Sequence, residues 1–469
     1  MLFNSGIFLQ FFAAFLLFYW LVRDSLKARN LLIVASSYLF YGWWNWKFLG
    51  LLFFSSAFDW SVGHALARLQ APRDRKALLA GSILVNLGIL GFFKYYNFFA
   101  TSLAELFGRL GVPFHTGTLN VILPVGISFY TFQSMSYAFD VYRGHLQPTR
   151  NFVNFLAFVS FFPHLVAGPI QRVSQLLPQF ERTLVVTRTM LEEGIWLMIW
   201  GMFKKVVIGD SVAPLVEMVF HDEPPGAAAV VLGTVAFGLQ IYCDFSGYSD
   251  LARGLARVLG FDIMWNFDLP YFATSLREFW RRWHISLSTW LRDYLYISLG
   301  GNRRGPARAC VNVFLTMLLG GLWHGAAWNF VLWGAWHGAG LVAERIFSGD
   351  QAAPKSALPL RRIAGWLATM LIVFYGWLLF RARSWHQVAA LTTALANPSA
   401  PPWLGAFAFT LAVFAVPLVA MEVWQFRAKN RLAPLSLAGW ARALLQGALL
   451  VGIMIFWTRE KATFIYFQF

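Results

Sequence analysis

The chain has 469 residues, 58% of them hydrophobic and 13% charged, with a mean hydropathy of +0.55. This composition excludes a soluble multidomain protein and is typical of a chain that crosses a membrane many times. The two cysteines exclude a disulfide framework and a cysteine-rich metal site. A basic inner face next to anionic lipid accounts for the net charge of +16, with a dedicated acidic partner as the alternative. No bound metal and no nucleic-acid partner are predicted.

Apolar runs long enough to span a membrane recur along the whole chain. A helix needs about 17 to 23 such residues to cross roughly 30 Å of hydrocarbon. We therefore predict an all-α polytopic membrane protein with about ten to twelve transmembrane helices. The runs lie near residues 7–22, 31–46, 48–66, 77–99, 120–142, 190–208, 228–250, 309–323, 328–345, 362–380, 403–424 and 440–457.

The charge order at the N-terminus is that of a membrane anchor and not that of a cleavable signal peptide. "MLFNSG" carries no positive charge, whereas Arg23, Lys27 and Arg29 follow the first apolar run. By the positive-inside rule the N-terminus is predicted to lie outside. The basic loops at 68–76 and 143–150 fall on the cytoplasmic side in the same count.

The apolar segment at 151–172, "NFVNFLAFVSFFPHLVAGPIQR", is interrupted by Pro163, Gly168 and Pro169. Non-helical backbone at membrane depth is tolerated only inside protein or along a wet cavity. We therefore predict a re-entrant segment whose freed backbone groups face an interior site.

Residues 276–295, "LREFWRRWHISLSTWLRDYL", have the periodicity of an amphipathic helix. At about 100° per residue the apolar side chains form one stripe and the arginines lie opposite it. We predict a single helix in the membrane interface, with its basic face toward headgroups or cytosol. The candidates for holding a phosphate-bearing ligand are Arg277, Arg281, Arg282 and His284; membrane anchoring is the alternative role of this face.

Acidic residues also occur within an apolar run, in "YCDFSGYSD" at 242–250. Asp244 and Asp250 are about 240° apart around a helix, too far to form one carboxylate pair. Asp244 therefore needs a different partner. An intramembrane acid is a functional candidate by default, with a satisfied structural network as the alternative. Asp244 and Tyr248 are therefore supporting site candidates.

Two histidines interrupt the stretch "GGLWHGAAWNFVLWGAWHG" at 320–338. His324 and His337 are thirteen residues apart, which is about 20 Å along one helix, so they cannot form a pair on one helix. The spacing is also unlike that of a metal motif such as HExxH. The glycines at 320, 321 and 325 predict instead that the helix breaks near His324 and leaves its imidazole facing a cavity with tryptophan walls. The preceding run, 309–323, is too short to cross the membrane fully, at about 22 Å.

A neutral, buried histidine suits one chemical role, the removal of a proton from a hydroxyl or thiol that becomes a nucleophile. His324 is therefore the candidate general base. A histidine that only joins helices by hydrogen bonds is the alternative, and this is the preferred interpretation of His337. The supporting candidates beside His324 are His337, Trp323 and Gly325.

Several long motifs follow one another along the chain in the same order as in one known protein family. They are "LPVGISFYTFQSMSYAFDVYRG" (123–144), "FFPHLVAGPIQR" (161–172), "YCDFSGYSDLARGLARVLGF" (242–261), "EFWRRWHISLSTWLRDYLYISLGGNRRG" (278–305) and "GLWHGAAWNFVLWGAWHG" (321–338). With these motifs the chain resembles the membrane-bound O-acyltransferases, and specifically their bacterial alginate O-acetyltransferase branch. The resemblance covers most of the chain.

The resemblance implies a helical bundle around a central funnel, with re-entrant and interfacial helices and the family's catalytic histidine at His324. It also implies a cytoplasmic thioester donor, acetyl-CoA or an acyl-carrier thioester, with no bound cofactor. The acceptor side would open to the periplasm of a bacterial inner membrane. The acetyl group would pass toward a cell-surface polysaccharide, directly or through periplasmic acetyltransferase partners.

We therefore predict one integral-membrane acyltransferase domain over residues 1–469, with its motif-bearing core at about 120–345. An oxyanion donor is required, and Trp N–H groups or backbone at the glycine break are the possibilities. A transporter of an acylated or anionic substrate is the alternative function. Transporters often contain internal repeats, however, and none is evident between the two halves. A purely structural subunit is the third interpretation.

Overall fold

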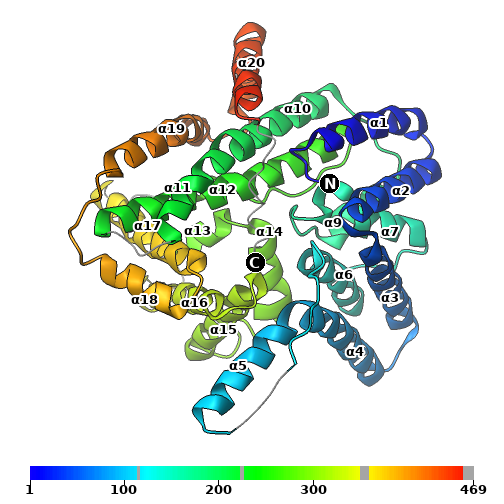
Figure 1. Cartoon of the computed structure of the whole chain (residues 1–469). Coiled ribbons are helices and arrows are strands. Elements are labelled where there is room, and N and C mark those ends of the chain that lie inside the picture. Colours follow the sequence, from blue (N-terminus) through cyan, green and yellow to red (C-terminus); the bar gives the residue numbers. More distant parts are fainter. Residues whose placement is uncertain (113–116, 222–225, 349–358, 458–469) are drawn as a thin grey trace. The chain divides into compact units, whose positions relative to one another are not determined.

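The computed structural model describes residues 1–112, 117–221, 226–348 and 359–457, and these residues form helices joined by loops, without a strand (Figure 1). Among these described residues, five helical segments are long and apolar enough to cross a membrane, and Gly6–Val22 and Gly439–Ile455 are shorter apolar helices. The predicted all-α polytopic fold class is confirmed. The five segments are Pro72–Arg109, Ala227–Val258, Pro306–His324, Pro359–Arg381 and Leu404–Ala428.

Other predicted spans also form helices, but these helices bury polar side chains. α2 (Leu26–Asn45) buries Arg29 and Asn30, and α3 (Leu49–Arg68) buries Asp59. Asp59 accepts hydrogen bonds from Ser82, Asn86 and Ser134, so its partners lie on other helices and not within its own segment. Because such helices are less apolar than the five segments above, the total of ten to twelve transmembrane helices stays a prediction.

The chain forms two compact units, the first of which comprises residues 1–191 and 255–264. In this unit α6, which is buried along almost its whole length, packs against α3, α4, α7 and α9. Besides α2 and α3, its helices are α1 (Gly6–Val22), α4 (Pro72–Leu90), α5 (Tyr96–Arg109), α6 (Ile127–Tyr142), α7 (Phe152–Ser160), α8 (Phe162–Leu165) and α9 (Val173–Phe180), with η1 (Trp46–Phe48) and the π-turn η2 (Gly91–Tyr95).

The predicted interruption of residues 151–172 is confirmed within this unit. α7 ends at Ser160. The next helix, α8, is a single turn with Pro163 as its second residue, and nearly all of the segment is buried. A side chain at Gly168 would meet the backbone of His164, so the chain turns tightly here. The re-entrant path itself stays a prediction.

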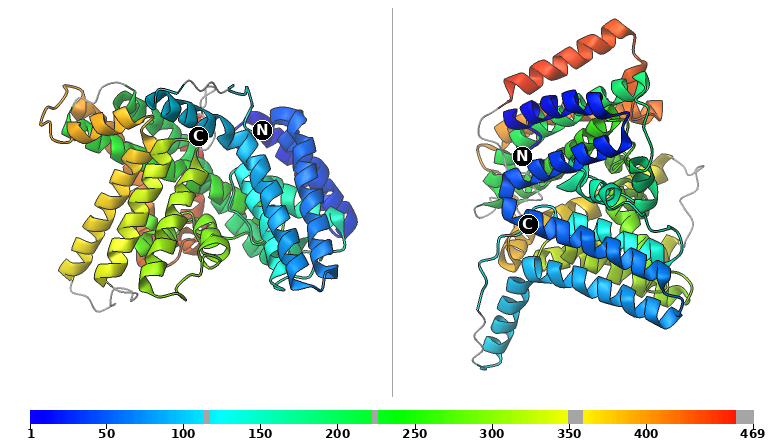
Figure 2. Two further views of the ribbon diagram at one scale, coloured as in Figure 1. Left: turned by 90° about the horizontal axis from the view of Figure 1, so that it is seen from below. Right: turned by 90° about the vertical axis from the view of Figure 1, so that its right-hand side faces the viewer.

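The second unit comprises residues 192–254 and 265–469. α15 (Pro306–His324) and α16 (Trp328–Ser348) form a helical hairpin, and α17 (Pro359–Arg381) packs against α16 (Figure 2, left, yellow-green and yellow). The remaining elements are α10 (Arg188–Phe203), η3 (Lys204–Gly209), α11 (Asp210–Phe220), α12 (Ala227–Val258), η4 (Pro270–Phe272), α13 (Leu276–Arg282), α14 (Ile285–Trp290), η5 (Leu291–Tyr296), α18 (Trp385–Ala394), α19 (Leu404–Ala428), η6 (Ala433–Ser436) and α20 (Gly439–Ile455).

The prediction of one continuous helix over 276–295 is wrong. The segment divides into α13, α14 and the π-turn η5, and His284, between the first two, has a left-handed backbone with φ 42°. The backbone of Asn266 accepts a hydrogen bond from Ile285 N at 2.9 Å, so tertiary contacts hold the break open. The apolar stripe is nonetheless buried as expected, at Leu276, Phe279, Trp283, Leu287, Trp290 and Tyr294.

The helix before His324 is longer than predicted. α15 has 19 residues, about 28 Å, because Pro306 starts it ahead of the apolar run and it continues through His324. The expectation that this segment is too short to cross the membrane is therefore wrong. The break itself is confirmed, because α15 ends at His324 and α16 begins at Trp328.

Candidate active site

His324 is the last residue of α15, and its side chain is buried in the second unit with a residue exposure of 5%. Aromatic rings enclose the imidazole. Its ring centroid lies 5.1 Å from that of Trp333 on α16 and 5.4 Å from that of Phe380 on α17, both in edge-on geometry. Trp323, the preceding residue, is 5.1 Å away. Three helices therefore fix the ring, and the predicted tryptophan surroundings are present.

Gly321 and Gly325 do not open space around His324. A Cβ at Gly325 would lie less than 3.0 Å from the ring of Phe330, and one at Gly321 would lie equally close to the Phe330 carbonyl and to Gly334. These residues therefore allow α15 and α16 to approach closely, as small residues do between membrane helices. Gly321 and Gly325 therefore serve helix packing, and neither of them lines the cavity described next.

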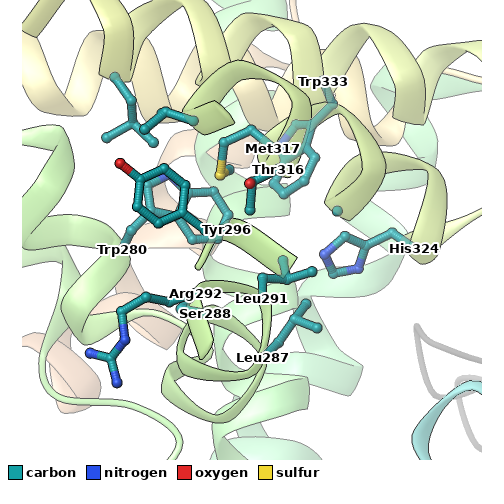
Figure 3. Close-up of a pocket in the computed structure, with 13 residues that line it drawn as sticks. Trp280, Leu287, Ser288, Leu291, Arg292, Tyr296, Thr316, Met317, His324 and Trp333 are labelled. Carbon is teal, nitrogen blue, oxygen red and sulfur yellow. The ribbon is translucent and has the colours of Figure 1, made fainter. Parts of the chain in front are cut away.

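A cavity of about 160 Å³ lies on the other side of the imidazole. Figure 3 shows His324 on one side of this cavity and Arg292 and Tyr296 on the other. Apolar side chains supply most of the surface between them. The lining residues are Trp280, Leu287, Ser288, Leu291, Arg292, Tyr296, Val313, Thr316, Met317, Gly320, His324, Trp333 and Leu341. A buried imidazole thus faces a small, largely apolar space.

A second histidine accompanies His324. His284 is fully buried, and its ring centroid is 6.3 Å from that of His324. The His284 Nδ1 lies 3.1 Å from the amide oxygen of Asn266, whose Nδ2 donates to Ser249 Oγ. Because the amide oxygen accepts, Nδ1 carries the proton and Nε2 carries the lone pair. Burial, followed by the proximity of His324, holds the pKa of His284 well below its ordinary value.

The predicted ligand-holding set, Arg277, Arg281, Arg282 and His284, is thus divided. Arg277 pairs with Glu344 at 2.6 Å, whereas Arg281 is exposed. Arg282 pairs with Glu278 at 2.8 Å and donates to the backbone of Asp268. The three arginines lie on α13, and His284 is buried inside beside His324.

Glu278 anchors the start of α13. Burial opposes its ionisation, but hydrogen bonds from Thr274 and Arg282 hold the pKa of the Glu278 carboxyl below its usual range. The arginine that lines the cavity is Arg292, which sequence reasoning did not select; it pairs with Asp293 at 2.6 Å.

The other supporting candidates lie behind the cavity or apart from it. His337 is fully buried against Trp333, at 4.9 Å, and Trp280, at 5.2 Å, and it is not among the residues that line the cavity. Asp244 and Tyr248, both buried on α12, do not line it either. His337 thus supports the tryptophans that do.

Asp244 has the partner that its position required. Lys205 Nζ lies 2.7 Å from Asp244 and 2.7 Å from Asp210, and the adjacent Lys204 pairs with Asp250 at 2.7 Å. Both lysines lie on the π-turn η3 and are buried. Sequence reasoning counted these lysines within an apolar run and missed them, although two adjacent lysines there were the available signal.

Metal ligands do not gather around either histidine. Within the described ranges, no group of three or more His, Cys, Asp or Glu side chains is placed to hold a metal ion. The polar groups here are instead those of an acid–base site: the imidazole of His324 on the cavity wall and, beside it, the imidazole of His284, which an amide orients. Fold and site together are those of an apolar helical protein with a buried histidine on the wall of an apolar cavity.

Comparison with known proteins identifies the family. The sequence profile of the membrane-bound O-acyltransferase family matches residues 145–384. The chain is 46% identical to a protein of Azotobacter vinelandii named "Probable alginate O-acetylase AlgI". The alignment extends over 398 residues and covers 83% of this chain and 78% of that protein. The chain is 34% identical over 416 residues to the peptidoglycan O-acetyltransferase of Helicobacter pylori, covering 82% of this chain and 77% of that one.

A more distant relative is the teichoic acid D-alanyltransferase of Bacillus subtilis, 26% identical over 284 residues, which are 57% of this chain and 71% of that one. The chain belongs to the membrane-bound O-acyltransferase family and is an O-acyltransferase. The resemblance inferred from the motifs is confirmed, and the transporter alternative is set aside.

Proposed function

We propose that this enzyme transfers an acetyl group from a thioester to a hydroxyl group, with His324 as the general base. The observation that carries the proposal is a buried imidazole on the wall of an apolar cavity. The acceptor hydroxyl gives its proton to His324 while its oxygen bonds to the thioester carbonyl carbon. The carbon–sulfur bond then breaks, and the imidazolium returns the proton to the leaving thiolate, so that no net proton is consumed.

The donor proposed is acetyl-CoA or an acyl-carrier thioester presented from the cytoplasm. A small apolar cavity lined by Arg292 and His324 suits an aliphatic arm that ends in a thioester. Phosphate groups outside the cavity would meet guanidinium groups, which bind them strongly. Arg281 is exposed, whereas Arg277 and Arg282 are engaged with glutamates, so Arg281 is the best placed of the predicted set.

His284 has a supporting role in this proposal. Its neutral ring, fixed by Asn266, places a second imidazole beside His324. Because the His284 ring stays neutral, a proton that His324 takes from the acceptor meets no second positive charge beside it. Trp323 and His337 hold the aromatic wall, and Asp244 and Tyr248 stabilise α12. For His284, the supporting role beside His324 replaces the phosphate-binding role that the sequence predicts.

The acceptor proposed is a cell-surface polysaccharide of the alginate type. The relatives named for alginate and peptidoglycan O-acetylation support this substrate class. The enzyme would lie in a bacterial inner membrane, with its N-terminus in the periplasm, among membrane lipids and periplasmic acetyltransferase partners. Residues 1–469 would act as one acyltransferase domain, with the core at about 120–345.

The test is transfer across a sealed bilayer. The purified protein is reconstituted into vesicles of known orientation, and isotope-labelled acetyl thioester, on CoA or on acyl carrier protein, is added to one side only. Labelled O-acetyl groups should appear on a polysaccharide or short uronate oligomer on the opposite side. Transfer only when donor and acceptor share one side would contradict the proposed direction, and no transfer from either thioester would contradict the proposed donor.

A further inference from the structure

Apart from His324, the polar groups that line the cavity fall into two sets. The first set already donates hydrogen bonds within the protein: Ser288 to the Trp283 carbonyl at 3.1 Å, Thr316 to the Asn312 carbonyl at 2.6 Å, Tyr296 to Asn302, and Arg292 to Asp293 at 2.6 Å. These donors are engaged with acceptors of the protein itself. The second set consists of two indole N–H groups.

Trp280 and Trp333 both line the cavity, and the Nε1 of each is buried without an acceptor among the residues that the structure describes. Trp333 is 1% exposed, and its ring meets that of Trp280 at 5.6 Å with an interplanar angle of 72°. A buried N–H that lacks an acceptor is unfavourable, and proteins rarely retain one without a reason. Two such groups on one cavity indicate that a ligand supplies the acceptor.

The position of Trp333 indicates which ligand atom this is. The ring centroid of Trp333 is 5.1 Å from that of His324. A ligand oxygen that accepts a hydrogen bond from the Trp333 N–H therefore lies close to the acceptor hydroxyl and the thiolate, the two groups between which His324 moves a proton. The surrounding leucines, methionine and valine keep the local dielectric low. A hydrogen bond to a developing negative charge is stronger in such surroundings than in water.

We propose that Trp333, with Trp280 as a second donor, forms the oxyanion site of the transfer reaction. This inference rests on the proposed function. When the acceptor oxygen bonds to the thioester carbonyl carbon, the electron pair of the C=O π bond moves to the carbonyl oxygen, and the indole N–H groups hydrogen-bond that oxygen. Collapse of the tetrahedral intermediate re-forms the C=O bond and expels the thiolate, which takes the proton held by His324.

The test removes one N–H while keeping an aromatic ring. Trp333→Phe and Trp280→Phe are compared with Trp196→Phe, a matched control. Trp196 is fully buried on α10, its Nε1 likewise lacks an acceptor within the described part of the chain, and it does not line the cavity. Each variant is assayed for kcat, KM and Tm with the acetyl thioester, on CoA or acyl carrier protein, that the unmodified enzyme turns over.

Trp333→Phe should lower kcat at least 100-fold, or about 2.7 kcal/mol of transition-state stabilisation, with KM and Tm close to those of the unmodified enzyme. Trp280→Phe should lower kcat at least tenfold, and Trp196→Phe should leave it unchanged. Retention of more than a third of kcat by Trp333→Phe would overturn the inference, as would equal losses of kcat and Tm in Trp333→Phe and Trp196→Phe. If Trp333→Phe does not fold, normal kcat in Trp280→Phe is the contrary result. An active His324→Ala enzyme would instead contradict the proposed function itself.

Discussion

His284 and His324 lie with their ring centroids 6.3 Å apart, although one belongs to the break between α13 and α14 and the other ends α15. Asn266 fixes the first ring through an Nδ1 to Oδ1 distance of 3.1 Å. The same amide oxygen accepts from Ser286 Oγ at 2.8 Å, and Asn266 Nδ2 donates to Ser249. One loop residue therefore orients a histidine toward the centre of the site.

The buried His284 should make the protein less stable in acid. Its folded-state pKa lies well below the ordinary value of about 6.5, so the unfolded chain binds more protons below that pH. The contribution of His284 to the free energy of unfolding is fully present above a pH of about 6.5 and is lost as the pH falls. At a pH of about 5.5 the free energy of unfolding should be lower by about 1.4 kcal/mol. His284→Gln removes this titration, so its Tm should fall less between these two pH values than that of the unmodified protein. An unchanged pH dependence of Tm would count against the neutral, buried ring.

Gly325→Ala should lower stability before it lowers activity. The added Cβ would overlap the Phe330 ring, and overpacking of this kind costs about 1–3 kcal/mol. We expect a lower Tm and yield, with activity per folded molecule within about twofold of normal, since the cavity lies elsewhere. Gly447→Ala, where nothing lies within 4 Å of the new Cβ, is the control and should keep its Tm. A Gly325→Ala protein that is stable but inactive would contradict this prediction and would indicate that substrate passes close to Gly325.

These glycines show what a sequence can and cannot predict here. Glycine at 320, 321 and 325 correctly predicts the break that follows His324, because glycine disfavours continuous helix. Whether glycine leaves an opening or fits a neighbour depends on the facing helix. Here Phe330 and Gly334 fill the space beside Gly321 and Gly325, whereas Gly320 lines the cavity. Only distances between α15 and α16 could decide this.

The segment at 276–295 shows a similar limit. Its apolar periodicity correctly predicts the buried stripe, since burial follows side-chain spacing whether or not the helix is continuous. Its break at His284 depends on hydrogen bonds that His284 and Ile285 donate to Asn266, a residue in another loop. His284 therefore moves from a predicted basic face to the interior, and local pattern contains no signal for that contact.

Lys205→Met should be strongly destabilising. The substitution leaves Asp244, whose side chain is 2% exposed, and Asp210 without their shared cation, which typically costs about 3–5 kcal/mol. A large fall in Tm is expected, with partial recovery when Asp244→Asn is added. Arg442→Met breaks a more exposed pair with Glu192 and should cost less than about 1 kcal/mol. Equal Tm values for the Lys205 and Arg442 variants would show that the buried lysine is dispensable.

Arg281→Glu and Arg282→Glu should differ in kind. Arg281 is exposed, so its reversal should raise KM for the thioester donor at least threefold and increase the sensitivity of KM to salt, at unchanged Tm. Arg282 holds Glu278 and the Asp268 carbonyl, so its reversal should lower Tm. Arg361→Glu, the same charge change at an exposed position of α17, is the control for KM. An unchanged KM in Arg281→Glu would limit this surface to membrane anchoring.

The most direct test of the account is the single-turnover rate of acetyl transfer by His324→Ala, measured beside His337→Ala on samples of equal Tm. His324 lines the cavity and His337 lies behind its tryptophans, although both are buried histidines within the same hairpin. Loss of a general base typically lowers the rate by about 10²–10⁴-fold. We predict a loss of this size for His324→Ala and a much smaller one for His337→Ala. A His324→Ala enzyme that transfers acetyl groups at the normal rate would contradict the central claim.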